Sequence, residues 1–240
     1  MDKIKHKDAK KIIKRNEFAE LVSSIGKFAS KNTENVIITA VIAVIIVVAI
    51  PVIINFRKTN EVKAERLISE ANFYINRPVV EDSNMTMYGF FRSKNEKYEK
   101  AIQTYLEVIS KYRGTNQAPA AYLGAANAYY NNGMYKEALE YYGTFIDKYK
   151  SSPLYPEALS GKGYALYQSG NYQEAVNVWQ DTKIFESGPN ANDVKLKLAD
   201  CYVKLNDKQK AIDIYKKITE EMKGTFWASV ASEKMKEIKL

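Results

Sequence analysis

The fold is decided by the stretch AAYLGAANAYYNNGMYKEALEYYGTFIDKY, residues 120–149. Small and apolar residues recur every three or four positions on both sides of the central NNG, which predicts two helices joined by a short turn. Five tyrosines lie between Tyr129 and Tyr142, in a chain of formal charge +8. Such tyrosines are either a stacking platform for single-stranded nucleic acid or the packing residues of a helical core.

The same pattern recurs along the chain with a nearly constant period. Ala101, Ala138, Ala175 and Ala211 are spaced by 37, 37 and 36 residues. An aromatic residue follows each alanine by four positions, at Tyr105, Tyr142, Trp179 and Tyr215. The breaks between helices fall at Gly133, Gly170 and Asn206, residue types that readily adopt the left-handed conformation after a helix. A period of this length is typical of a helical solenoid, in which each repeat buries one face against the next.

These residues resemble the tetratricopeptide repeat family. Three full units match, at residues 119–152, 156–189 and 192–225, after an imperfect first unit at about 60–113. The resemblance implies an all-α fold, a tetratricopeptide-type α-α solenoid with a C-terminal capping helix at 225–240. It also implies that Tyr129, Tyr135 and Tyr142 pack in the core. The first unit carries an insertion at about 76–94, which is either a loop folded over the end of the solenoid or a partner or membrane contact.

A membrane anchor is expected ahead of the repeats. Val36 to Ile54 is a run of nineteen residues without a charge, and fourteen of them are Val or Ile. As a helix this run would span roughly 28 Å, close to the ~30 Å hydrocarbon core of a bilayer. A buried strand would be much shorter, and a cleavable signal peptide would begin nearer the N-terminus. We therefore expect a single transmembrane helix at 36–56 and a repeat domain at 57–240.

The charges around the anchor bear on its orientation. Residues 1–35 hold nine Lys/Arg against five Asp/Glu, which favours a basic tail that stays in the cytoplasm. Close to the anchor the balance reverses, because Lys27 and Lys31 precede it whereas Arg57, Lys58, Lys63 and Arg66 follow it. Since long domains are translocated largely regardless of charge, we expect the tail inside and the repeat domain outside.

The tail also contains an amphipathic segment, NEFAELVSSIGKFAS, residues 16–30. Its apolar residues fall within about 120° of one helical face at about 100° per residue. They are Phe18, Leu21, Val22, Ile25, Phe28 and Ala29. Two interpretations remain open: a helix lying in the plane of the inner leaflet, or a helix that packs on a partner or is only incipient.

The residue composition argues against most catalytic and metal-binding sites. His6 is the one histidine and Cys201 the one cysteine, so the repeat domain cannot build a His/Cys metal centre or a histidine-dependent nucleophile. No glycine-rich phosphate loop is present, and residues 55–240 mix 27 Lys/Arg with 23 Asp/Glu. We therefore expect no enzyme, no cofactor, no metal, no nucleic acid and no small-molecule substrate.

The organisation of nearly the whole chain is similar to the membrane-anchored bacterial tetratricopeptide proteins typified by the ancillary subunit of the Sec translocon. This resemblance implies a scaffold in the bacterial inner membrane that binds a protein or peptide, with translocon or envelope-assembly components as partners. The alternative is a scaffold facing the cytoplasm that recruits a soluble complex to the membrane.

The family's groove-facing positions carry over to three successive repeats. They fall on Leu123, Asn127, Tyr130 and Asn131, then on Ser160, Tyr164, Tyr167 and Gln168, and then on Leu196, Asp200, Val203 and Lys204. The set that clamps a partner's C-terminal carboxylate in chaperone-binding members is not reproduced. Asn127 fits that set, but Leu123 and Ser160 stand where lysine would be needed.

Overall fold

The structure is a computed structural model that describes residues 17–27, 30–31, 33–80, 90–181 and 190–239. Four parts of the sequence-based expectations lie outside these residues: the basic segment 1–16, Phe28 and Ala29 of the amphipathic segment, most of the insertion (81–89), and the end of the second full repeat (182–189). The chain divides into two compact units, Met1–Lys58 and Thr59–Leu240.

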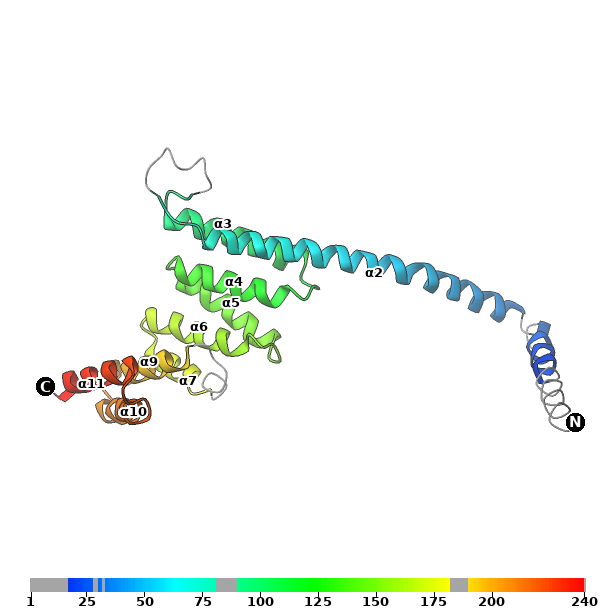
Figure 1. The fold of residues 1–240 in the computed structure, drawn as a ribbon. Coiled ribbons are helices and arrows are strands. Elements are labelled where there is room, and N and C mark those ends of the chain that lie inside the picture. The colour runs from blue at the N-terminus through cyan, green and yellow to red at the C-terminus, as the bar shows by residue number, and fades with distance from the viewer. Residues whose placement is uncertain (1–16, 28–29, 32, 81–89, 182–189, 240) are drawn as a thin grey trace, which may run out of the picture. The chain divides into compact units, whose positions relative to one another are not determined.

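The described elements are helices (Figure 1). A helical segment at 17–27 comes first. It is followed by α2 (Thr33–Ile75), α3 (Lys94–Lys111), α4 (Ala118–Asn131), α5 (Tyr135–Lys148), α6 (Tyr155–Gln168), α7 (Tyr172–Trp179), α9 (Ala191–Lys204), α10 (Lys208–Glu221) and α11 (Phe226–Lys239). The all-α solenoid predicted from the repeat period is confirmed, because consecutive helices of the second unit stack on one another from α3 to α11.

Helix α2 does not end where the membrane segment was expected to end. The sequence predicts a helix at 36–56 and a separate one from about 60, but a single helix of 43 residues runs from Thr33 to Ile75. The reason is the lack of a stop signal, since residues 52–75 contain neither Gly nor Pro. Pro51 lies inside the helix without ending it. The expected boundary therefore falls within one continuous element.

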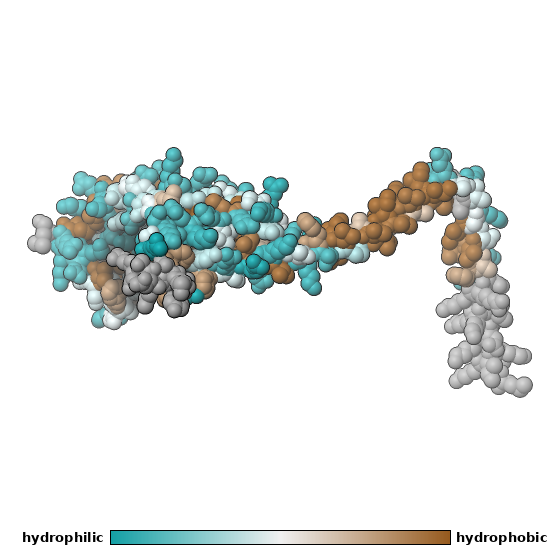
Figure 2. Space-filling model, turned by 90° about the horizontal axis from the view of Figure 1, so that it is seen from above, coloured by the Kyte–Doolittle hydropathy of each residue, from teal (hydrophilic) through white to brown (hydrophobic). Residues whose placement is uncertain are grey.

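The two parts of α2 differ in exposure. The large apolar side chains from Ile37 to Ile54 are 50–69% exposed and form the brown stretch along this helix in Figure 2. By length and composition, α2 is the one helix among the described residues that could cross a membrane. Further along, Ala64 and Ala71 are fully buried in the first hydrophobic cluster of the second unit. The end of α2 thus serves as the first helix of the first repeat.

Each repeat is a pair of helices joined by a tight turn. The pairs are the end of α2 with α3, then α4–α5, α6–α7 and α9–α10. Three of the turns contain a residue with positive φ, at Gly133 (80°), Gly170 (80°) and Asn206 (62°). The predicted left-handed turn positions are therefore confirmed. The first pair is instead connected through the insertion, whose base is closed by a hydrogen bond from Val80 N to Phe91 O of 2.8 Å.

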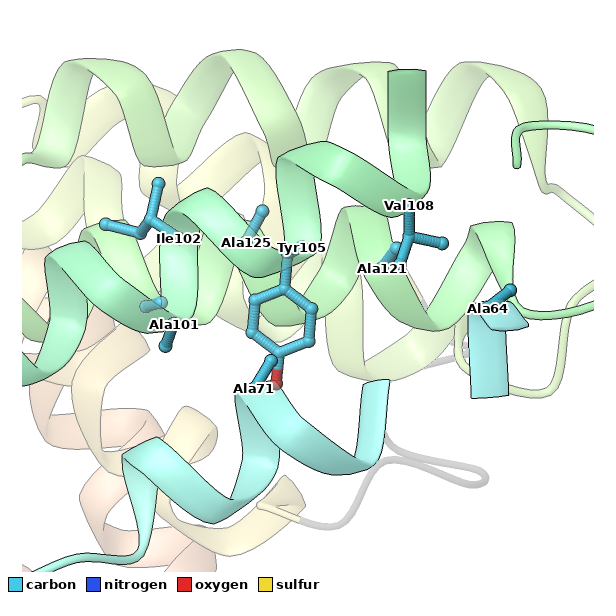
Figure 3. Close-up of a cluster of buried hydrophobic side chains, with 9 residues drawn as sticks. Ala64, Ala71, Ala101, Ile102, Tyr105, Val108, Ala121 and Ala125 are labelled. Atoms are coloured by element: carbon cyan, nitrogen blue, oxygen red, sulfur yellow. The ribbon is translucent and has the colours of Figure 1, made fainter. Parts of the chain in front are cut away.

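The core repeats the contact between small and aromatic residues. Tyr105, Tyr142, Trp179 and Tyr215 are at most 2% exposed, and the four aligned alanines are fully buried. Figure 3 shows the Tyr105 ring pointing from α3 toward Ala71 of α2. Glycine makes room for these rings in the adjacent helix. A Cβ atom on Gly124 would lie 2.4 Å from the Tyr105 ring, and one on Gly161 would lie 2.4 Å from the Tyr142 ring.

Helix α11 covers the last pair with one apolar face. Ala228 and Ala231 are buried, and Trp227, Val230 and Met235 pack against the cluster formed by α9 and α10. Phe226, at the start of the helix, does not belong to this apolar face, because its side chain is 71% exposed.

The glycine contacts give a matched test of this packing. A Cβ atom on Gly163 would lie 2.0 Å from Trp179 Nε1, whereas one on Gly143, inside α5, would meet nothing within 4 Å. We expect Gly163→Ala to destabilise the protein by about 1–3 kcal/mol through overpacking. Gly143→Ala should stabilise it by about 0.5–1 kcal/mol through helix propensity. Urea unfolding of the full chain in detergent, followed by circular dichroism, measures both; equal effects of the two variants would contradict the packing.

Candidate protein-binding surface

The expected groove residues lie on α4, α6 and α9, the first helices of three successive repeats. Helix α4 contacts α6, and Tyr164 of α6 is hydrogen-bonded to Asp193 of α9, so residues at equivalent positions form rows that cross from one repeat to the next. Some members of the expected set are exposed, some are held in hydrogen bonds between repeats, and some are buried.

The expectation that Leu123 and Asp200 are available to a partner must be corrected. Leu123 is 4% exposed and belongs to the cluster around Tyr142 and Phe145. Asp200 is 7% exposed. Ser160 and Leu196, at the same position as Leu123 in their repeats, are buried as well. The physical reason differs between Leu123 and Asp200: Leu123 packs in one cluster with Ala158 of the next first helix, whereas Asp200 is covered by Tyr215 and Lys234.

Asn127 and Tyr164 are half-buried, and their side chains are hydrogen-bonded to residues of neighbouring repeats. Tyr142 Oη donates to Asn127 Oδ1 at 2.5 Å, and Asn127 Nδ2 donates to Glu157 Oε1 of the next repeat at 3.2 Å. Tyr164 Oη donates to Asp193 Oδ2 of the following repeat at 2.5 Å. These bonds run in series along the first helices, so they tie one repeat to the next.

In three repeats, the same position of the first helix carries a side chain that accepts a hydrogen bond. The buried tyrosine of the second helix donates to the side chain of the first helix, from Tyr105 to Asn72 at 2.5 Å and from Tyr142 to Asn127. In the last repeat Tyr215 donates to Asp200. The second full repeat differs because Trp179 replaces the tyrosine. Its Nε1 instead donates to the Ser160 carbonyl oxygen at 3.3 Å, which leaves Tyr164 to reach Asp193.

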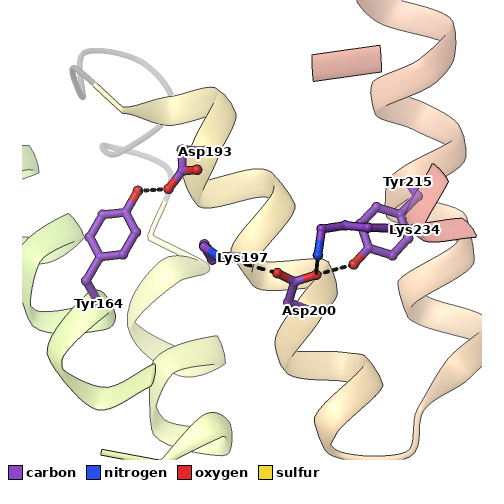
Figure 4. A network of polar contacts seen from close by, with 6 residues as sticks. All are labelled: Tyr164, Asp193, Lys197, Asp200, Tyr215 and Lys234. Atoms are coloured by element: carbon purple, nitrogen blue, oxygen red, sulfur yellow. Dashed lines mark hydrogen bonds and ion pairs between the residues drawn. The ribbon is translucent and has the colours of Figure 1, made fainter. Parts of the chain in front are cut away.

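Asp200 is the centre of a charged network (Figure 4). Lys234 Nζ of α11 lies 2.9 Å from Asp200 Oδ1, and Lys197 Nζ lies 3.6 Å from Asp200 Oδ2. Tyr215 Oη also donates to this carboxylate. Two ammonium groups therefore compensate one buried carboxylate, and α11 is fixed to α9 by a polar contact as well as an apolar one.

Burial keeps the hydroxyls of these tyrosines protonated. It raises the pKa of Tyr105 to about 12, and together with the Asp200 charge it raises the pKa of Tyr167 to about 12. The pKa of Tyr164 is raised by burial and by its hydrogen bond to Asp193. Tyr105 and Tyr164 therefore remain hydrogen-bond donors across the physiological pH range. Burial also raises the pKa of the Cys201 thiol to about 12, so it is not a reactive thiolate.

Two tyrosine pairs remain accessible at the turn between the helices of a repeat. Tyr130 lies against Tyr135 with ring centroids 5.7 Å apart, and Tyr167 lies against Tyr172 at 5.5 Å. All four residues are half-buried, and within the described part of the chain their hydroxyls make no hydrogen bond. We call these two pairs the rim tyrosines. In contrast to these four hydroxyls, those of the buried tyrosines Tyr105, Tyr142 and Tyr215 all donate a hydrogen bond.

Polar side chains adjoin the rim tyrosines. Asn131 and Gln168 follow Tyr130 and Tyr167 directly and are exposed, as is Lys204 in the third repeat. Asn131 Nδ2 donates to the Asn127 carbonyl oxygen at 2.8 Å, which leaves its Oδ1 directed to no other described residue. The equivalent of the rim pair in the third repeat is Val203 with Lys208, so the aromatic surface ends after two repeats.

Sequence reasoning missed Tyr135 and Tyr172 as surface residues. Their recurrence three positions before the repeat alanine is visible in the sequence, but such recurrence favours core packing. Tyr129 and Tyr135 are in fact half-buried, and only Tyr142 of the expected three is fully buried. A recurring position can thus lie at the edge of the core, and recurrence alone does not separate the two cases.

The comparisons with known proteins agree with the observed fold. The family model described as tetratricopeptide repeat matches residues 92–149, 123–182 and 162–222. A search of curated proteins finds no significant match. Among solved structures, the nearly identical TPR-like repeats assigned to a kinesin light chain of Podosopora anserina align with a TM-score of 0.56 and 16% identity, over 73% of this chain and 86% of that chain.

Two further structures give similar values. A single-substitution variant of the same Podosopora anserina repeats aligns with a TM-score of 0.54 and 16% identity, over 73% of this chain and 85% of that chain. MamA of AMB-1 aligns with a TM-score of 0.49 and 16% identity, over 76% of this chain and 86% of that chain. At such identities a structural likeness concerns the fold alone.

Substitutions of Asp200 test the network around α11. Asp200→Ala removes the acceptor of Tyr215 and leaves Lys234 unpaired, so we expect a loss of about 2–3 kcal/mol. Asp200→Asn keeps an acceptor like that of Asn127 and should cost about 1 kcal/mol. As a control, Asp213→Ala changes an exposed carboxylate of α10 and should stay within about 0.5 kcal/mol of the parent. Urea unfolding gives all three values, and an alanine variant as stable as the control would refute the network.

Proposed function

This chain belongs to the tetratricopeptide repeat family, and we propose that it is a membrane-anchored scaffold that binds a protein partner on the first-helix face of its repeats. In this family that face is concave, and repeat solenoids use such faces to bind peptides and protein segments. The observation that carries the proposal is that the two rim tyrosine pairs occupy equivalent positions in consecutive repeats.

The chemistry of this surface suits a polypeptide. Tyrosine offers a large, rigid ring together with a hydroxyl, and it is enriched where protein interfaces are energetically strongest. The rim hydroxyls and the amides of Asn131 and Gln168 can bond to a backbone without needing a charge on the partner. Since the carboxylate of Asp200 is compensated by Lys197 and Lys234, the face has no uncompensated buried charge at this position.

The anchor supports attachment to a membrane. Nineteen uncharged residues of α2 expose large apolar side chains over their whole length, a surface that water would disfavour and a bilayer would accept. We propose a single-pass protein of the bacterial inner membrane, with residues 1–35 in the cytoplasm and the repeat domain outside it. On this basis its partners are translocon or envelope-assembly components, as for the ancillary Sec subunit that it resembles.

Rim-tyrosine substitutions test the binding surface. A photoreactive residue at Gln168 should crosslink to a partner in cells, whereas one at Glu140, an exposed position on α5, should not give the same product. The double variant Tyr130→Ala/Tyr167→Ala should reduce that product at least tenfold, because each buried interface tyrosine contributes roughly 1–3 kcal/mol.

Phe226→Ala is the matched control for this experiment. It removes an aromatic side chain that is 71% exposed and far from the rim in sequence, and it should leave the crosslink unchanged. If the double variant crosslinks as well as the control does, the rim tyrosines are not the binding surface.

Cysteine labelling tests the orientation. In a chain whose buried native thiol is removed by Cys201→Ala, exposed positions are available on both sides of the anchor, at Ser23 and Ser151. We expect an impermeant maleimide to label Ser151→Cys in spheroplasts, and to label Ser23→Cys only after lysis. The opposite pattern supports the cytoplasm-facing alternative that recruits a soluble complex, and labelling of both sites in spheroplasts would exclude a membrane-spanning α2.

A further inference from the structure

The helical segment 17–27 carries an exposed apolar stripe. Phe18, Leu21, Val22 and Ile25 are 67%, 56%, 51% and 59% exposed. They follow the i, i+3, i+4, i+7 spacing that places side chains on one face of a helix. A face of this kind is not stable in water, so it is covered in the functional protein by lipid or by protein.

The opposite face is polar. At about 100° per residue, the four apolar residues span about 100° of the helix circumference. Glu20, Ser23 and Lys27 lie on the other side, and all three are exposed. The segment therefore has the sharp division between an apolar and a polar face that in-plane membrane helices show. With eleven residues it is only about 16 Å long, which is too short to cross a bilayer.

The short connection to α2 limits how far this helix can lie from the start of α2. Five residues, 28–32, separate it from the start of α2 at Thr33. Fully extended, five residues reach at most about 18 Å. If α2 spans the membrane, as the proposed function requires, the helix cannot leave the bilayer surface by more than that distance. Tethering of this kind makes insertion of even a weakly binding helix favourable, because its local concentration at the surface is high.

The positive charge of the preceding segment, residues 1–16, favours binding to anionic lipids. Residues 1–16 contain seven Lys/Arg and two Asp/Glu. The helix itself has Glu17 and Glu20 against Lys27, so its own polar face does not supply the attraction. Basic residues near a membrane surface bind anionic phospholipids, and they lose this attraction as salt increases.

From these observations we propose that residues 17–27 form an interfacial helix that binds the anionic phospholipid surface of the membrane crossed by α2. Phe18, Leu21, Val22 and Ile25 insert between the acyl chains, and Ser23 faces water. This inference rests on the proposed membrane anchor, and it adds a second, reversible lipid contact on the side of the N-terminal tail.

Spin-label accessibility tests the proposal on the full chain. In the Cys201→Ala background, nitroxide labels are placed at Ile25→Cys on the apolar face, at Ser23→Cys on the polar face, and at Val44→Cys within α2. Leu21→Cys gives an independent second reading of the apolar face. Each protein is reconstituted into vesicles of phosphatidylcholine with phosphatidylglycerol, and into phosphatidylcholine alone. Collisions with oxygen report lipid, and collisions with a nickel chelate report water.

We expect the ratio of oxygen to nickel collisions to be several-fold higher at positions 25 and 21 than at position 23, and to fall when phosphatidylglycerol is omitted. If positions 25 and 21 match position 23 while position 44 is deep in lipid, the anchor holds and the interfacial helix is refuted. Labels at position 25 shielded from both reagents with mutual spin broadening would mean packing on a second copy, which also overturns it. A water-exposed position 44 would refute the anchor itself.

Discussion

The structure depends on one repeated contact, a buried aromatic ring of each second helix packed against small residues of the first helices. Tyr142 fits because Gly161 has no side chain, and Trp179 fits because Gly163 has none. Close-packed interiors tolerate little change in volume, so this contact fixes the distance between helices and therefore the register of the solenoid. The rows of side chains on α4, α6 and α9 are a consequence of that register.

The same aromatic residues decide which polar groups a partner can reach. A buried tyrosine hydroxyl needs an acceptor, and it takes one from the first helix, as Tyr142 does from Asn127. Positions that would otherwise be free for recognition are therefore used to hold the repeats together. The proposed binding surface instead uses the last turns of the first helices and the starts of the second helices, where the rim tyrosine hydroxyls make no hydrogen bond within the described residues. On this proposal, stability and binding fall to different residues of the repeat.

The sequence predicts the periodic part of this arrangement well and the non-periodic part poorly. The spacing of Ala138, Ala175 and Ala211 is enough to predict the solenoid, because a core of this type must recur with the repeat. The pairing of Asp200 with Lys234, 34 residues away, depends on how α11 docks, and no local pattern specifies that. The continuity of α2 follows from the absence of a stop signal, which is easily overlooked when a change in composition suggests a boundary.

The central claim is that a protein partner binds over the rim tyrosines of two consecutive repeats. Hydrogen exchange of the full chain, with and without its crosslink-identified partner, tests this most directly because it reads every helix at once. We expect slower exchange confined to the last turns of α4 and α6 and the turns that follow them, around residues 130–135 and 167–172. Protection confined to α10 and α11, or absent from both rim segments, would contradict binding at the rim tyrosines.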